Sequence, residues 1–235
     1  MISGLLSSVS GKINISGDNL TVDSDALFQS TSTNNIAIGL NALNSTGADS
    51  DNNIGIGVNA LTAITTGDGN TSIGYQAGKS LTTSGDNLAI GYKALENATT
   101  AAHQNIAIGN LSMDGAWSTA DVDNCVVVGY GAMRGVLTNT TSGTTAIGAS
   151  ALAALTSGAK NTAIGYTAGK AIDSDIGNTL LGYETGLALQ GGNAHYNTAI
   201  GGLALTAATT ASARNTAIGY TAMAGLVGGT VADCE

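Results

Sequence analysis

A short phrase recurs along the chain and constrains the fold more than any other feature. Its copies have the form Asn–x–Ala–Ile–Gly, as in residues 161–165 and again in 215–219, and Ala usually follows three residues after the glycine. Eleven copies align on their glycines, which are 17 to 20 residues apart. Repetition at a period of this size is typical of a solenoid, in which each repeat forms one coil. The aligned glycines are Gly39, Gly57, Gly74, Gly91, Gly109, Gly129, Gly148, Gly165, Gly182, Gly201 and Gly219.

The phrase itself predicts a short strand, because its large and small residues alternate. We expect the apolar residue before the glycine to point into a hydrophobic interior. The Ala and Gly would then share a smooth opposite face, which another backbone can approach closely. The residues expected to point inward are Ile38, Ile56, Ile73, Ile90, Ile108, Ile147, Ile164, Ile200 and Ile218.

The segments between the phrases predict a second short strand and then a polar turn. Residues 166–169 (YTAG) have the pattern of such a strand, and residues 65–70 (TTGDGN) are rich in the residues that turns select. A helix is the competing interpretation for residues 149–160 (ASALAALTSGAK). Stretches this short are marginal as helices, and their glycines and β-branched residues count against helix.

Composition excludes several function classes. The net charge is −9 with only seven basic residues, so we expect no nucleic acid partner. No apolar run reaches the roughly 20 residues of a membrane helix, and the first residues lack the basic start of a secretory signal. We therefore expect no membrane insertion. Cys125 and Cys234 are expected to be free thiols in a reducing cytoplasm.

The coils must be thin, because the chain is 43% hydrophobic but has only one Phe and one Trp. Eleven coils stacked at the spacing of β-strands would form a rod about 50 Å long. A lone rod with so small a core would be poorly stabilised. The smooth Ala/Gly face therefore predicts that several chains pack along a shared axis.

The repeat N-x-A-I-G-x-x-A resembles the head repeat of trimeric autotransporter adhesins, the YadA-type or haemagglutinin-type repeat. The resemblance covers residues 35–223 and implies a left-handed parallel β-roll, three chains around one axis. The period here is longer than is common in that family. We also see no signal peptide, heptad stalk or C-terminal membrane strands, and so do not expect an autotransporter.

Residues 16–28 (SGDNLTVDSDALF) are similar to a phrase common in fibre and appendage proteins of tailed phages. This resemblance implies an attachment or capping segment over residues 1–34 and a repeat shaft over 35–235. It further implies a structural protein of a virion that is assembled in the host cytoplasm. The expected partners are two copies of the same chain, other virion structural proteins, and a glycan or protein on a host surface.

Aromatic residues are the first candidates for a binding surface. The position after the repeat glycine is aromatic in six copies, which would stack into partial ladders. These tyrosines could bind sugars by stacking, or they could stiffen the rod by packing on one another. Trp117, in the loop 112–123, could be a contact residue or could cap its coil. The tyrosines are Tyr75, Tyr92, Tyr130, Tyr166, Tyr183 and Tyr220.

Ion sites are weaker candidates. His103 and His195 both precede a repeat position by two residues, and in a trimer three imidazoles could hold an ion near the axis. The acidic loops 48–53, 68–70 and 172–178 could bind calcium through oxygen ligands. Solvated loops are the simpler interpretation of both features, so we expect no metal and no cofactor.

No nucleophile, base and acid recur together at repeat positions, so we expect a protein that is not an enzyme. Three alternatives stay open. The chain could be a fragment of a bacterial surface adhesin, or a β-helix enzyme acting on polysaccharide. An ice-binding solenoid is the third, but it needs regular Thr columns, and Thr follows the Asn in only some copies, such as Thr162, Thr179, Thr198 and Thr216.

Overall fold

The computed structural model of the chain describes residues 14–15, 20–21, 34–45, 50–99, 102–117, 121–138, 141–189, 193–207 and 213–225. Two short strands lie before the repeats, β1 (Asn14–Ile15) and β2 (Leu20–Thr21), and they pair antiparallel. Nearly all of the expected attachment segment, residues 1–34, lies outside the described residues. Residue 34 belongs to the first coil.

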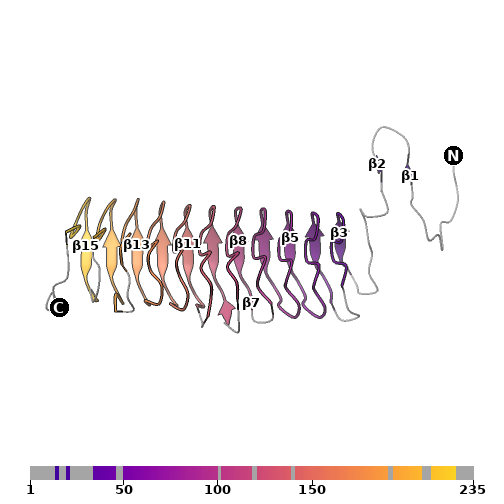
Figure 1. Cartoon of the computed structure of the whole chain (residues 1–235), viewed down its shortest axis with the longest axis horizontal. Helices are drawn as coiled ribbons and strands as arrows, with labels where there is room; N and C mark the ends of the chain where they lie inside the picture. Colours follow the sequence, from indigo (N-terminus) through magenta and orange to yellow (C-terminus); the bar gives the residue numbers. More distant parts are fainter. Residues whose placement is uncertain are drawn as a thin grey trace.

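The repeats form a rod of stacked coils (Figure 1). Each copy of the phrase contributes one three-residue strand, and the eleven strands form a single parallel sheet in chain order. The prediction of a parallel β-solenoid is confirmed. The strands are β3 (Ile36–Ile38), β4 (Ile54–Ile56), β5 (Thr71–Ile73), β6 (Leu88–Ile90), β8 (Ile106–Ile108), β10 (Val126–Val128), β11 (Thr145–Ile147), β12 (Thr162–Ile164), β13 (Thr179–Leu181), β14 (Thr198–Ile200) and β15 (Thr216–Ile218).

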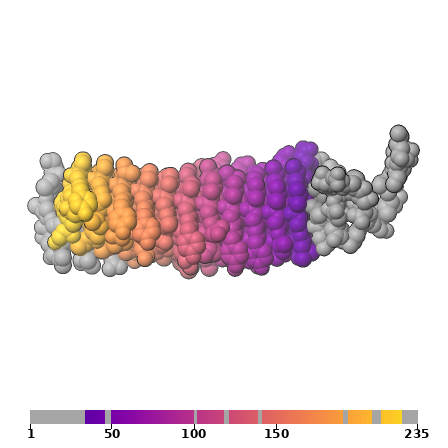
Figure 2. All heavy atoms as spheres, turned by 90° about the horizontal axis from the view of Figure 1, so that it is seen from above, coloured from indigo at the N-terminus to yellow at the C-terminus, as the bar shows by residue number. Residues whose placement is uncertain are grey.

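Every strand pairs in the same register with the next. Between β11 and β12, for example, Thr145 lies beside Thr162 and Ala146 beside Ala163. Equivalent side chains therefore form columns along the rod, one residue per coil. The space-filling view shows the straight, even outline that follows from this register (Figure 2).

The direction of the strand side chains is opposite to the prediction. The middle residue of each strand, usually Ala, is buried, and the residues on either side are partly or fully exposed. Ala37 is 2% exposed, whereas Ile38 is 42% exposed. The expectation that Ile points into the interior, and that Ala and Gly form an outer face, is therefore wrong.

The thinness of each coil explains the reversal. The interior between the strand and the chain opposite it is filled mainly by side chains from the turn, such as Leu61 and Leu95, which are fully buried. Where a glycine occupies that turn position, a later residue fills the space. A Cβ on Gly78 would lie 3.0 Å from Leu61 Cδ2 and 3.1 Å from Leu81 Cδ1. The strand can therefore supply only a small side chain to the core.

The second strand of each coil is also not observed. The segment after the glycine is a series of turns, in which alternate residues have positive φ, as at Tyr166's neighbour Thr167 (φ 51°) and then Gly169 (φ 59°). An extended strand needs negative φ at every residue. The rejection of helix is confirmed, since the described residues contain strands and turns only.

The repeat glycines are required by the adjacent coil. They have φ between 125° and 143°, a region that side chains disfavour. A Cβ on Gly165 would lie 2.1 Å from the carbonyl oxygen of Gly182 in the next coil. The close approach therefore occurs between coils of one chain.

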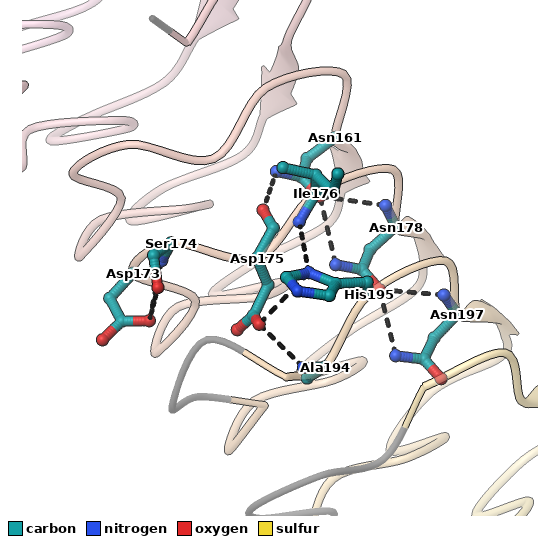
Figure 3. A network of polar contacts seen from close by, with 9 residues as sticks. All are labelled: Asn161, Asp173, Ser174, Asp175, Ile176, Asn178, Ala194, His195 and Asn197. Carbon is teal, nitrogen blue, oxygen red and sulfur yellow. Dashed lines mark hydrogen bonds and ion pairs between the residues drawn. The ribbon is translucent and has the colours of Figure 1, made fainter. Parts of the chain in front are cut away.

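The repeat asparagines form a buried ladder beneath the strands, which the sequence analysis did not foresee. The backbone N–H and the Nδ2 of Asn178 both donate to Oδ1 of Asn161, at 2.9 and 3.1 Å. Asn197 donates to Asn178 in the same way (Figure 3). Among the described residues, Nδ2 of six of these asparagines also donates to a carbonyl in the loop of the next coil, as from Asn161 to Asp175 at 2.7 Å. The ladder thus fastens the coils to one another, through the asparagine side chains themselves and through the loop of the next coil.

The ladder is interrupted at two adjacent coils, where Cys125 and Thr144 replace Asn. The Cys125 N–H still donates to Asn105 Oδ1 at 3.0 Å. A thiol supplies no amide oxygen for the next coil, and the Thr144 hydroxyl is buried without a partner among the described residues. Extra pairing lies near this place, through β7 (Ala102–His103) with β9 (Val122–Asp123) and through a parallel bridge between Trp117 and Leu137.

Candidate binding surface

The outward side of the parallel sheet carries two columns of side chains, which we call the sheet face. One column consists of the first residue of each strand and the other of the third residue. The third residue is Ile, Val or Leu in every coil. The exposed apolar members of this face are Ile36, Ile38, Ile106, Leu181, Ile200 and Ile218. A contiguous apolar strip of this kind is uncommon on a soluble monomer and is typical of an interaction surface.

The first column changes character halfway along the rod. From β3 to β10 it is apolar except for Thr71, whereas from β11 to β15 it is Thr in every strand. These five threonines are consecutive and in register, so the Thr column is more regular than the sequence analysis recognised. They are Thr145, Thr162, Thr179, Thr198 and Thr216.

The six predicted tyrosines directly follow the repeat glycines, two residues after the last residue of their strands. Two pairs from successive coils stack, Tyr75 on Tyr92 with ring centroids 5.3 Å apart and Tyr166 on Tyr183 at 5.5 Å. All of these rings are more than 40% exposed. Four of the six tyrosines therefore stack in pairs, and all six remain accessible to solvent. The seventh tyrosine, Tyr196, lies before a repeat Asn and contacts His195 edge-on.

Charged groups accompany the first tyrosine pair. Glu96 forms ion pairs with Lys93 at 3.2 Å and with Lys79 at 3.7 Å. The Lys93 ammonium also lies 5.7 Å from the centre of the Tyr92 ring. The hydrogen bond and charge of Glu96 raise the pKa of Lys93. In the second pair, the hydrogen bond to Glu184 raises the pKa of Tyr183.

Trp117 does not present a contact surface. Its side chain is only 8% exposed and belongs to the hydrophobic core. This burial does not fit the role of an exposed contact residue, and it places Trp117 in the packing of the coils.

The two histidines bind the preceding coil in the same way. Nδ1 of His103 accepts from the Gly85 N–H and Nδ1 of His195 from the Ile176 N–H, both at 3.1 Å. His195 Nδ1 also lies 3.5 Å from Oδ1 of the buried Asp175 (Figure 3). These contacts fix His195 against its neighbour rather than leaving it free in a loop.

The acidic loops do not gather into an ion site. Asp51 N–H donates to Asp68 Oδ1 at 2.7 Å, and Ala194 N–H donates to Asp175 Oδ1 at the same distance. The carboxylates thus bind backbone N–H groups of adjacent coils. Within the described part of the chain, no three Asp, Glu, His or Cys side chains converge as metal ligands. Residues 48–49 of the first loop lie outside it.

Cys125 is buried within the ladder, and its Sγ donates to the Thr141 carbonyl at 3.4 Å. Burial raises the pKa of this thiol to about 11. It is therefore protonated and unreactive at neutral pH. Cys234 lies outside the described residues.

Two features were not predicted from the sequence, the ladder of asparagines and the basic residues that recur five positions after the repeat glycine. Both are visible as fixed offsets from the glycine, Asn four residues before it and Lys79, Arg134 and Lys170 five after it. In the regions that the structure covers, no helix is long and apolar enough to cross a membrane. Searches against protein-family models, curated proteins and solved structures find no match to this chain.

Proposed function

We propose that this protein is a structural fibre or appendage subunit of a phage virion, which assembles as a homotrimeric rod. Its sheet face packs against two other copies, and its remaining sides project a surface that binds a host. The mechanism is passive, because many weak contacts along a stiff rod add up through avidity. Other virion structural proteins would hold one end of the rod.

The sheet face is the observation that carries the proposal. Its column of third residues is apolar along the whole rod and lies outside the chain's own core, so covering the face would remove apolar area from water. The resemblance to trimeric head repeats supplies the number of chains. The reversed direction of the strand side chains strengthens this argument, because the branched apolar residues stand where a partner chain would meet them.

The solution mass of the full chain tests the assembly. Native mass spectrometry should give three times 23.0 kDa. A charge placed on the face, as in Ile164→Glu, should dissociate the trimer, since an unpaired buried charge is strongly unfavourable. Ala154→Glu is the matched control, because Ala154 is exposed in a turn away from the strands. A monomeric wild-type chain would contradict the proposal.

The virion assignment needs a separate measurement. Purified phage particles from a host that carries the gene should contain the chain, as detected by peptide mass spectrometry. Detection on intact bacterial cells, and not on particles, would instead support the adhesin alternative.

A further inference from the structure

Three successive coils near the middle of the rod differ from the others along the tyrosine edge. The coils after β10, β11 and β12 read GYGAMR (129–134), GASALA (148–153) and GYTAGK (165–170). The outer two carry a tyrosine after the glycine and a basic residue four positions later. The middle coil has alanine at both positions. None of the three segments contains an acidic residue.

Backbone hydrogen bonds hold the three coils in register here. The Ser150 N–H donates to the Tyr130 carbonyl, and the Thr167 N–H donates to the Ala149 carbonyl, both at 2.9 Å. Tyr130, Ala149 and Tyr166 are therefore successive members of one column. The two tyrosines stand two coil spacings apart, which is about 9.6 Å, with only a methyl group between them.

The rings leave room for one further ring. Tyr130 is 57% exposed and has no ring neighbour among the described residues. Tyr166 is 53% exposed, and Tyr183 covers one of its faces, so its other face is turned toward the coil of Ala149. A ring above Ala149 would lie about 4.8 Å from each tyrosine, within the spacing at which rings stack.

Each of the two coils that flank Ala149 carries a basic residue. Arg134 folds back along its own turn, since a Cβ at Gly131 would lie 3.1 Å from Arg134 Cδ and 4.0 Å from Ser150 Oγ of the middle coil. Lys170 is exposed on the other side. Arg134 interacts electrostatically with Asp114, whose pKa is raised by burial in spite of this nearby positive charge. The contact of Lys93 with Tyr92 shows that cations reach these rings elsewhere on the rod.

The other gaps in the tyrosine column lack this combination. Between Tyr92 and Tyr130 stands Asn110, whose Oδ1 accepts from the Tyr92 N–H at 3.0 Å. Carboxylates, Glu96 and Asp114, occupy the basic position there. Between Tyr183 and Tyr220 stands Gly202, and the Tyr220 ring already reaches over it, since a Cβ at Gly202 would lie 3.5 Å from that ring.

We propose that Tyr130, Tyr166, Arg134 and Lys170 bind one acidic sugar residue of a surface polysaccharide. The apolar faces of the sugar ring would lie between the two tyrosines, and its carboxylate would pair with the guanidinium, which suits planar anions. The net charge of −9 repels a densely charged polyanion, so the polysaccharide carries sparse charge. This inference rests on the proposed function in one respect, that the tyrosine edge stays outside the trimer contact.

Calorimetric titration of the full-length protein with three tetrasaccharides tests the proposal. The probes are a hyaluronan tetrasaccharide, with a carboxylate on alternate sugars, neutral chitotetraose, and a densely sulfated heparin tetrasaccharide. Hyaluronan tetrasaccharide should bind best. Equal binding of chitotetraose, tighter binding of heparin, or no binding of the hyaluronan probe would each overturn the proposal.

Variants locate the site. Tyr166→Ala should weaken binding of the hyaluronan probe about tenfold, which corresponds to about 1.4 kcal/mol. Arg134→Gln with Lys170→Gln should remove the preference over chitotetraose. Tyr75→Ala and Lys79→Gln are matched controls, at the same two column positions elsewhere, and should change neither. An equal loss from the controls would overturn the site.

The mass of each sample is measured alongside. A monomer that binds the probe would contradict the trimer and keep this site, whereas a trimer that does not bind would contradict the site alone.

Discussion

Two regions of the rod have the same strands, turns and glycines but differ in the hydrogen bonds that join their coils. Most coils carry Asn in the buried ladder, whereas two adjacent coils carry Cys125 and Thr144 instead. In the unbroken part, Asn87 donates to Asn70 and accepts from Asn105, and it also reaches the Ala102 carbonyl at 2.7 Å. At the interruption, Thr144 receives no amide oxygen from Cys125, and Asn161 receives none from Thr144. The backbone path is therefore set by the glycines and turns, while the asparagines add stability to it.

The glycine column should be equally necessary in both regions, and it gives the largest effect. A Cβ on Gly74 would lie 2.4 Å from the Gly91 carbonyl oxygen, and one on Gly129 would lie 2.5 Å from that of Gly148. We expect Gly74→Ala and Gly129→Ala each to cost about 3 kcal/mol or more, from overlap and positive φ. Chemical denaturation measures both. A mild effect of Gly129→Ala alone would mean that the interrupted coils are loosely stacked.

Substitutions in the column of the ladder should have different effects on stability in the two regions. Asn87→Ala removes the oxygen that accepts from the N–H and Nδ2 of Asn105, and it removes the Nδ2 that donates to the Ala102 carbonyl, which we expect to cost about 3 kcal/mol. Thr144→Ala removes a buried hydroxyl that has no described partner, and should cost less than about 1 kcal/mol. Denaturation midpoints of the two variants decide this. Similar losses would contradict the comparison.

Alkaline pH should act on the interruption through Cys125. Its pKa is raised from 9.0 to about 11 by burial, so the folded protein retains the thiol proton that the unfolded chain loses. Stability should therefore be unaffected below pH about 9 and should fall between about 9 and 11, by about 1.4 kcal/mol per pH unit. Denaturation at several pH values measures the slope. A slope that persists in Cys125→Ala would assign it to another group.

Repair of the ladder should give the smallest effect. In Cys125→Asn, the new side chain could accept from the Thr144 N–H and donate to the Thr141 carbonyl, which the thiol now contacts weakly. We expect a gain of about 1 kcal/mol. The same assay measures it, and hydrogen exchange at Thr144 should slow. A loss of stability would indicate that the space around residue 125 is too small for an amide.

The sequence predicted the repeats, the parallel strands and the absence of helix, because all three follow from the spacing of the glycines. The prediction of which face of the strand is inside was wrong. Alternation separates Ala37 from Ile38 but does not say how wide the interior is. That width depends on the side chains of Leu43 and its equivalents, which lie in the turn. These residues have positive φ, which bulky apolar residues rarely adopt, so the turn was not predicted. Arg134 and Lys170 lie in different coils, so the proposed site that they form with Tyr130 and Tyr166 depends on the register in which the coils stack.

The uniform register has a consequence for how such a rod can vary between related genes. Because each coil meets its neighbours through the same backbone contacts, removal of the residues from one repeat glycine to the next would join two matching surfaces. The rod would shorten by one strand spacing, about 4.8 Å, with its cross-section unchanged. The length of the rod can therefore change by whole coils, and the sequences of the remaining coils need not change.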